Sequence, residues 1–221
     1  MNDSLKYIYL SYFLDHLTPL YGGDKGISIS PHRSILKGDT ANTKQLSLQN
    51  HSGTHIDFPN HFFENGKTSE NYTADFWMFD KPFLVNRKAE ENEIFSLSDD
   101  EMKMIPNDID FLIIKTGFGE FRSEEKYWKH NPGFAPIFAT KLRVKFPNLK
   151  VIGMDFISLT SYQNRELGRE AHRMFLGGDK PILLIEDMDL SKIMNTPMSI
   201  SCLPLLISGI DGTPVTVIAK T

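Results

Sequence analysis

Three of the seven histidines in the chain lie between His51 and His61, in the segment H-S-G-T-H-I-D-F-P-N-H. His51, His55, Asp57 and His61 all occupy odd positions. In an extended segment, alternate side chains point to the same face, so these four side chains would converge. Imidazole nitrogens together with a carboxylate oxygen are the ligands that Zn²⁺ or Mn²⁺ requires. The motif therefore predicts a site for a divalent metal ion.

The spacing of the motif also predicts its local shape. A fully extended chain from His51 to Asp57 would cover about 20 Å, whereas ligands of one ion each lie about 2 Å from it. The chain must turn inside the motif, and Gly53 can provide the turn through a positive φ or a bulge. A helix would also align His51 with His55, but Ser-Gly-Thr between them are weak helix formers and Pro59 follows closely. The remaining alternative is three unrelated surface histidines before a turn.

A second group of polar residues follows predicted strands, where α/β domains often carry functional groups. Glu186 comes after four apolar residues, and burying its charge without a partner would be costly. A second metal ion would be such a partner, with His172 and Glu186 as ligands and Asp57 bridging the two ions. Glu186 as a helix cap or partner of Arg173, and His172 as an ordinary core or surface residue, stay open. Turn or cap roles are equally open for Asp155 and the Thr116-Gly117 pair.

The composition restricts the class of protein. The chain has 221 residues, 40% of them hydrophobic and 24% charged, as in ordinary globular domains. A net charge of −4 gives no basic surface, so nucleic acid is not an expected partner. No apolar run is long enough for a membrane span. The single cysteine, Cys202, excludes an intrachain disulfide and fits a reducing compartment, so we expect a cytoplasmic protein with a buried thiol.

Apolar patterns predict mixed strands and helices along the chain. Two helices are expected, at 136–146 with Ile137, Phe138, Leu142 and Phe146 on its apolar face, and at 165–176, ended by Gly177-Gly178. We expect polar irregular structure at 25–42, a loop at 62–73 and a solvated helix or loop at 87–104. The run 203–207 can be core or interface. The predicted strands cover residues 6–13, 44–49, 82–86, 111–114, 151–154, 181–185 and 214–219. This alternation predicts an α/β or α+β fold in a single domain over residues 1–221.

Taken together, these residues resemble the cyclase family of metal-dependent hydrolases, which includes bacterial kynurenine formamidase and isatin hydrolase. The family motif H-x-G-T-H-x-D-x-P-x-H matches residues 51–61 without a departure and is highly specific. Further segments are individually weak but extend the similarity over nearly the whole chain. They are L-D-H-L-T-P-L-Y-G-G-D at 14–24, I-I-K-T-G at 113–117, G-M-D-F-I-S at 153–158, A-H-R-M-F-L at 171–176 and G-T-P-V at 212–215.

The resemblance implies roles for individual residues. It implies that His51, His55 and Asp57 bind a first metal ion, and that Asp57, His172 and Glu186 bind a second. It also implies that His61 is the catalytic acid and base. Some relatives use one metal ion, in which case His172 and Glu186 support the ligands or contact substrate. We therefore expect one or two Zn²⁺ or Mn²⁺ ions per subunit.

The resemblance also implies a fold and an assembly. The fold is the swivelling β/β/α type, a mixed sheet packed by helices, in a homodimer or homotetramer. Thr216 stands where relatives often carry arginine after G-x-P-V, which leaves the outer part of the site or the subunit contacts in question.

The implied reaction is hydrolysis of an amide or lactone bond in a small molecule. The leading substrate is an aryl formamide such as N-formylkynurenine, an intermediate of tryptophan catabolism; an isatin-type cyclic amide or lactone is the alternative. A bound ion would activate water and polarise the carbonyl, and an ordinary histidine pKa near 6.5 suits His61 for moving the proton. Phe58, Phe62 and Trp77, with neighbouring Phe63 and Phe76, either line an aromatic pocket or belong to the core.

Two other classes of function use parts of the same motif. A mononuclear iron oxygenase would use His55, Asp57 and His172 as a facial triad. That reading leaves His51 and His61 without a role, and no arginine follows Arg173 to bind a keto-acid cosubstrate. A metal-binding or ligand-binding protein without catalysis is the other alternative, because a fold does not guarantee activity. The intact His61 argues against it, since pure binding needs no base.

Overall fold

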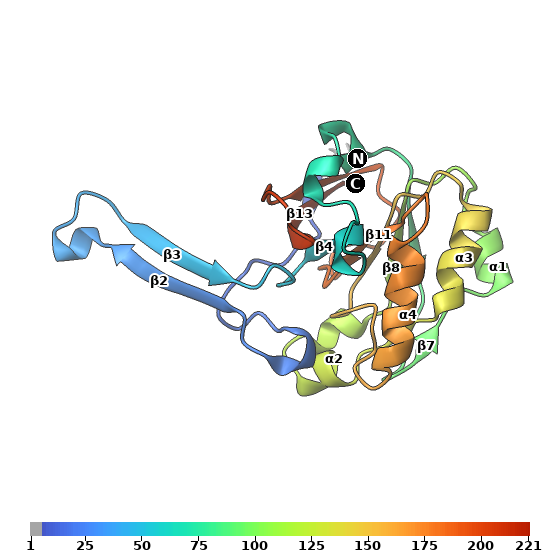
Figure 1. Ribbon diagram of the computed structural model, residues 1–221, viewed down its shortest axis with the longest axis horizontal. Helices are drawn as coiled ribbons and strands as arrows, with labels where there is room; N and C mark the ends of the chain where they lie inside the picture. The colour runs from blue at the N-terminus through green and yellow to red at the C-terminus, as the bar shows by residue number, and fades with distance from the viewer. Residues whose placement is uncertain (1–5) are drawn as a thin grey trace, which may run out of the picture.

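A mixed β-sheet forms the centre of the protein in the computed structural model, which describes residues 6–221 (Figure 1). Nine strands of this described part belong to the sheet. Their order is β5 (Met78–Phe79), β12 (Ser199–Pro204), β13 (Gly212–Lys220), β4 (His55–Asp57), β11 (Leu183–Glu186), β10 (Val151–Met154), β8 (Phe111–Lys115) and β6 (Pro82–Asn86), with β1 (Tyr7–Tyr9) beside β13. The predicted α/β fold with a mixed sheet is confirmed.

The sheet has a parallel half and an antiparallel half, and β4 joins them. Strands β6, β8, β10 and β11 run parallel, and their central members are continuous apolar runs buried on both faces. β4 pairs antiparallel with β11 on one side and with β13 on the other. β13 then pairs antiparallel with β12, and β12 with β5. The strand that carries two of the candidate metal ligands, His55 and Asp57, therefore lies fully buried at the junction.

Helices cover the parallel half of the sheet. α3 (Pro136–Lys145) packs against α4 (Arg165–Leu176), and α4 also contacts β11 (Figure 1). α1 (Asp99–Lys103) and α2 (Glu125–Lys129) are single short turns, and Ser98 with Glu101 forms a capping box on α1. The prediction that Ile137 belongs to the apolar face of α3 was wrong, because the buried stripe is Phe138, Ala139 and Leu142 and Ile137 is 54% exposed.

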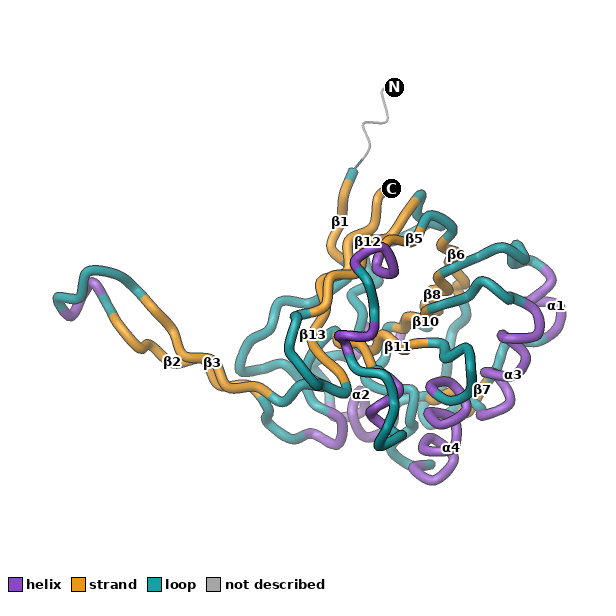
Figure 2. Tube along the Cα trace, turned by 45° about the horizontal axis from the view of Figure 1, so that its top comes forward, coloured by secondary structure: helices purple, strands orange, loops and turns teal. Residues whose placement is uncertain are grey.

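A two-stranded hairpin extends away from the rest of the molecule. It consists of β2 (Ile27–Arg33) and β3 (Thr43–Leu48), which pair antiparallel with each other (Figures 1 and 2). The prediction of irregular structure at 25–42 was therefore wrong over β2. Its serines, with Pro31, resemble a loop in the sequence, and the strand exists through its pairing with β3. We call residues 27–48 the arm.

Other local differences reflect pairing that sequence patterns do not encode. β1 is shorter than the predicted strand, and beyond it Ser11 makes one isolated bridge to Met188. β12 was not predicted, and the run 203–207 that follows into the next loop is exposed rather than core. Two short strands, β7 (Ile94–Phe95) and β9 (Gly133–Phe134), pair with each other. Cys202 is buried, as predicted. In the described part of the chain, no helix combines the length and the apolar character that a membrane crossing needs.

Candidate metal centre

The histidine motif turns at Gly53 before it enters β4. Gly53 has a φ of +63°, the left-handed conformation predicted for this position. This turn brings the His51 ring back over the strand, with its Nδ1 atom 2.8 Å from Oδ1 of Asp57. Within β4, His55 and Asp57 alternate with Ile56, so both polar side chains point to one face while Ile56 enters the core. His51, His55 and Asp57 therefore converge as predicted.

Strand pairing brings Glu186 to the same place. In the antiparallel pair of β11 with β4, Glu186 lies directly opposite His55, and opposite residues project from the same face. Oε2 of Glu186 lies 3.4 Å from Nε2 of His55. Glu186 is 3% exposed and also accepts a 2.6 Å hydrogen bond from the backbone N–H of Leu159. The alternatives of a helix cap or an ion pair with Arg173 are not observed among the described residues.

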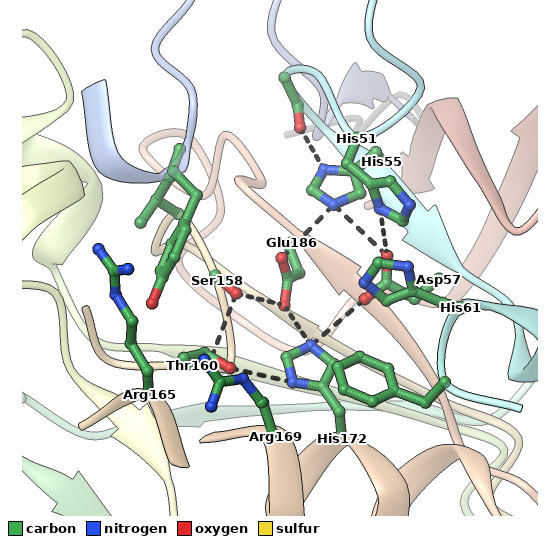
Figure 3. Close-up of a pocket in the computed structure, with 14 residues that line it drawn as sticks. His51, His55, Asp57, His61, Ser158, Thr160, Arg165, Arg169, His172 and Glu186 are labelled. Atoms are coloured by element: carbon green, nitrogen blue, oxygen red, sulfur yellow. Dashed lines mark hydrogen bonds and ion pairs between the residues drawn. The ribbon is translucent and has the colours of Figure 1, made fainter. Parts of the chain in front are cut away.

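Helix α4 supplies His172 from the other side of the site. His172 is 4% exposed, and its Nε2 atom lies 3.5 Å from both Oδ2 of Asp57 and Oε1 of Glu186. Figure 3 shows His172 and Glu186 next to Asp57, with His51 and His55 on the far side of that carboxylate. One oxygen of Asp57 thus faces His51 and His55, and the other faces His172. Asp57 therefore belongs to two groups of candidate ligands, one with His51 and His55 and the other with His172 and Glu186.

The hydrogen bond of His55 determines which nitrogen of its ring carries the proton. Nδ1 of His55 lies 2.8 Å from the carbonyl oxygen of Gly53, which can only accept, so this nitrogen carries the proton. In a neutral ring the lone pair then sits on Nε2, which faces Oε2 of Glu186 at 3.4 Å and Oδ1 of Asp57 at 3.5 Å. A lone pair facing two carboxylate oxygens is repulsive unless a cation lies between them or the ring is protonated.

His172 repeats this arrangement independently. Its Nδ1 atom is 3.0 Å from the carbonyl oxygen of Gly168, one turn earlier in α4, so the proton is again on Nδ1. Nε2 then directs its lone pair at one oxygen each of Asp57 and Glu186. Backbone carbonyls that orient histidine rings in this way are the usual outer support of metal-ligating imidazoles. The donor set of nitrogen and carboxylate oxygen fits Zn²⁺ or Mn²⁺.

The buried carboxylates create a strongly negative site. Burial alone would lower the pKa of His51, but the charge of Asp57 and hydrogen bonds with Asp211 and Asp57 raise it to about 10. For His172, burial is likewise outweighed by Asp57 and Glu186, which raise its pKa to about 9. Burial opposes ionisation of Asp57, yet the surrounding histidines hold its pKa well below the usual range. The side chains therefore favour positive charge in the site, which a metal ion supplies.

His61 lies at the edge of this cluster, in a short 3₁₀ turn (Pro59–His61) that follows β4. Its Nδ1 atom is 2.8 Å from Oδ2 of Asp211, and that oxygen is also 3.0 Å from Nε2 of His51. The structure thus places His61 beside the cluster and against a carboxylate, so that Nε2 carries the lone pair when Nδ1 donates to Asp211. His51, His61 and Asp211 together form a third potential group of ligands.

Asp211 is the residue of the site that the sequence prediction missed. It comes just before β13, and an Asp-Gly pair ahead of a strand has the appearance of an ordinary turn. The pairing of β13 with β4 places Gly212 opposite Asp57. A Cβ atom on Gly212 would overlap the imidazole of His51, so the glycine leaves room for that ring. The Gly-Thr-Pro-Val segment at 212–215 was a weak signal for this region, one residue short of Asp211.

A cavity of about 370 Å³ adjoins the cluster and is bounded by β4, β11 and α4. His51, His55, Asp57, His61, His172 and Glu186 all line it (Figure 3). Of the three aromatic residues expected to contact substrate, only Phe62 lines it, and its ring stacks on His172 with 4.7 Å between centroids. A small molecule therefore has access to the candidate ligands beside an aromatic surface.

The other aromatic predictions do not fit this cavity. Phe58 follows Asp57 and, by alternation, points to the opposite face, where it is fully buried against Tyr72 and Trp77. Trp77 belongs to the same hydrophobic core. Asp155 is also outside the cavity, because its carboxylate accepts hydrogen bonds from the backbone N–H groups of Thr116 and Gly117. It links the ends of two neighbouring strands, the turn role that the sequence left open.

The fold and the cluster define a class: an α/β protein with a mixed sheet whose buried histidine and carboxylate side chains suggest a divalent metal ion. A family model described as "Putative cyclase" matches residues 8–160, well over half of the chain. The chain belongs to this cyclase family, as its resemblance predicted.

Relatives in sequence agree with this assignment, and solved structures agree with the fold. The chain is 25% identical over 222 residues to a kynurenine formamidase of Bacillus thuringiensis subsp. konkukian (strain 97-27), with 97% of each chain covered. It is 25% identical over 208 residues to cyclase-like protein 2 of Oryza sativa subsp. japonica, covering 89% of this chain and 72% of that protein. Isatin hydrolase A from Labrenzia aggregata has the same fold, with a TM-score of 0.82 at 18% identity over 98% of this chain and 94% of that one.

Proposed function

We propose that the protein is a metal-dependent hydrolase that cleaves a C–N bond of an aryl formamide such as N-formylkynurenine. The observation that carries this proposal is the placement of two imidazole Nε2 atoms, of His55 and His172, 3.4–3.5 Å from oxygens of the buried carboxylates of Asp57 and Glu186. Kynurenine formamidases matched over nearly their whole length support the choice of substrate. The matching isatin hydrolase fold keeps a cyclic amide as the second candidate.

The proposed metal ligands fall into two groups that share one carboxylate. His51, His55 and Asp57 form the first, and Asp57 forms the second together with His172 and Glu186. A bound Zn²⁺ or Mn²⁺ ion would polarise the scissile carbonyl and lower the pKa of a water molecule. The presence of a second group of ligands favours two ions per subunit. With a single ion, His172 and Glu186 would instead hold the ligands of that ion in place or contact the substrate.

His61 is proposed to move the proton. Its Nδ1 atom contacts Asp211, which selects the tautomer with a free lone pair on Nε2. That nitrogen can accept a proton from attacking water and return it to the leaving nitrogen of the amide. Phe62, packed flat on His172, offers an apolar surface for an aryl group next to these atoms.

The test is hydrolysis of N-formylkynurenine by protein reconstituted separately with Zn²⁺ and Mn²⁺, compared with the His61→Ala variant. General acid–base catalysis contributes about 10² to 10⁴ in rate, so kcat of the variant should fall by that range while its metal content stays near that of the wild type. Loss of metal from the variant would instead make His61 a ligand.

Two outcomes separate the alternatives. A metal-loaded protein that cleaves cyclic amides or lactones but no formamide would replace the substrate proposal. A metal-loaded protein that hydrolyses none of these would favour the binding protein without catalysis. Oxygen consumption that depends on Fe²⁺ would revive the oxygenase alternative, which leaves His51, His61 and Asp211 without a role.

We also propose that the protein assembles as a homodimer through its arm. Ile27 pairs with Leu48 and Ile29 with Leu46, so these four side chains share one face of the hairpin. Ile29 is 36% exposed and Leu46 is 60% exposed. An isolated two-stranded hairpin is marginally stable in water, and an apolar stripe on one normally packs against another surface. A second copy of the chain would supply this surface.

A further inference from the structure

One side of α4 continues the cavity beyond the proposed metal ligands. Arg165, Arg169 and His172 are spaced i, i+4 and i+7, so they lie on one face of the helix. All three line the cavity. Figure 3 shows Arg169 between Arg165 and His172, with His51 and His55 at the other end of the view. The cavity therefore has a carboxylate-rich end near His172 and a cationic end near Arg165.

The two guanidinium groups are available for a ligand. Neither one forms an ion pair with a carboxylate anywhere in residues 6–221. Arg165 is instead held against the ring of Tyr162, with 4.0 Å between its Cζ atom and the ring centroid. Stacking of this kind orients a guanidinium without using its N–H donors. Arg165 thus presents a planar set of donors at the wall of the cavity.

Tyr21 adds a buried donor at the same end. Its hydroxyl oxygen is buried and has no hydrogen-bond partner among the described residues, although the residue lines the cavity and its ring packs on Tyr162 at 5.3 Å. Burial is the main factor that raises the pKa of Tyr21, to about 12, so the hydroxyl is protonated at neutral pH. A buried hydroxyl without a partner is costly in a folded protein, and a ligand that accepts its hydrogen bond removes this cost.

We propose that Tyr21, Arg165 and Arg169 bind a carboxylate of the substrate, at the opposite end from the bond that is cleaved. This proposal rests on the proposed function and narrows its substrate to amides that carry an acid group. A guanidinium fork matches the two oxygens of a carboxylate, and the tyrosine hydroxyl provides a further donor.

The spacing along α4 sets the size of such a substrate. At 1.5 Å per residue, Arg169 lies about 5 Å and Arg165 about 10 Å along the helix from His172. A molecule that reaches both ends therefore needs several bonds between its reacting carbonyl and its acid group. Phe62 and Ile157 also line the cavity and suit an aryl ring. An aryl formamide with an amino-acid side chain has this layout, whereas a neutral formamide leaves the arginines without a partner.

The test separates binding from turnover. Calorimetry of the metal-loaded protein would compare L-kynurenine, which carries the carboxylate, with 2-aminoacetophenone, which lacks the amino-acid group. The variants are Arg165→Gln, Arg169→Gln and Tyr21→Phe. Lys88→Gln is the control, because it removes the same charge from an exposed residue that does not line the cavity. Turnover of the corresponding formamides would be measured in parallel.

We expect each arginine variant to bind kynurenine about tenfold more weakly, with binding of the neutral ketone unchanged. Removing an arginine also removes repulsion of the ammonium group, so a loss of affinity reports the carboxylate. Unchanged ketone binding shows that the variant is folded. Tyr21→Phe should produce a smaller loss in the same direction, and Lys88→Gln should behave as the wild type.

Other results would contradict either the carboxylate site or the proposed function. The carboxylate site would be overturned if the variants lost affinity for both ligands equally, or if they bound kynurenine as the wild type does. It would also be overturned if the wild type bound no kynurenine. Arginine-dependent binding of kynurenine without hydrolysis of any formamide would keep the site and refute the proposed function. Hydrolysis of both formamides with equal kcat/KM in all variants would keep the function and refute the site.

Discussion

At the scale of single residues, the backbone decides which atoms of the site can bind a cation. The carbonyl oxygens of Gly53 and Gly168 hold the protons of His55 and His172 on Nδ1, so that both Nε2 atoms face carboxylates. In the absence of an ion, protons are the cations that relieve this repulsion. The raised pKa values of His51 and His172 have the same cause, because the carboxylates that would bind an ion also favour protonation of these rings.

Metal binding should therefore release protons. His51 and His172 have pKa values of about 10 and about 9, so both are protonated at pH 7.5 in the metal-free protein, whereas a metal ligand must be neutral. We expect more than one proton released per subunit at pH 7.5, and metal affinity that rises with pH until these groups have titrated. Calorimetry in buffers of different ionisation enthalpy measures this number.

The same shifts have a consequence for stability. A pKa raised above the unfolded value of about 6.5 stabilises the folded protein below that pH, and this contribution is lost as pH rises through the folded pKa. The metal-free protein should thus lose stability between about pH 6.5 and pH 10, and the metal-loaded protein should lose less. Metal binding without any proton release at pH 7.5 would contradict this account.

At the scale of elements, the site depends on register and on a close approach. The pairing of β4 with β11 sets Glu186 opposite His55, and the pairing with β13 sets Gly212 opposite Asp57. α4 must then lie near enough to bring His172 to the same carboxylates. Gly168, one turn before His172, makes this possible, because a Cβ atom there would overlap the side chain of Thr160.

Gly168→Ala should accordingly destabilise the protein. Alanine gains about 1 kcal/mol over glycine inside an exposed helix, but overpacking a buried contact costs about 1–3 kcal/mol. Here the overlap includes Cβ of Thr160, which a rotamer change does not remove, so we expect the cost to exceed the gain. Urea unfolding of the metal-free variant measures the balance, and weaker metal binding should accompany it.

Glu170→Ala provides the comparison, since this exposed residue lies on the same helix. It should leave the free energy of unfolding within about 0.5 kcal/mol of the wild type. If Gly168→Ala were instead more stable than the wild type, helix propensity would dominate and the close approach of α4 would not limit this position.

At the scale of the whole molecule, the arm is a hairpin that lies outside the mixed sheet and does not take part in the candidate metal centre. It extends away from the mixed sheet (Figures 1 and 2). The register of its two strands places its apolar stripe on one face. The exposed run 203–207 and the exposed Phe13 and Leu17 are further apolar surface on the body. Together they support the proposed dimer, in which the arm of one copy covers apolar surface of the other.

A pair of substitutions tests this assembly. Ile29→Glu with Leu46→Glu places two charges on the apolar face, and burying such side chains contributes about 1.5–3 kcal/mol each. We expect the dissociation constant of the dimer to rise at least about a hundredfold, seen as a monomer by light scattering after gel filtration. Ser28→Glu with Ser47→Glu, a paired position on the opposite face, should stay dimeric. A monomeric wild type would refute the proposal.

The sequence by itself determined the parts of this protein that depend on short spacing. The turn at Gly53, the convergence of His51, His55 and Asp57, helix α4 and several buried strands follow from local conformational preference and periodicity. The charge of Glu186 after an apolar run, and the resemblance to the family at 171–176, added Glu186 and His172 to the predicted site. Each of these signals lies within one segment, so no knowledge of the partner segments was needed.

Only the tertiary structure decided what required the register of distant strands or the packing of a helix. Asp211 belongs to the site because β13 pairs with β4, and an Asp-Gly sequence does not by itself predict that pairing. The binding role proposed for Arg165 and Arg169 depends on which face of α4 lines the cavity. Phe58 belongs to the core because it alternates with Asp57 across the sheet. β2 is a strand because β3 completes its hydrogen bonds, and backbone pairing of this kind is nonlocal.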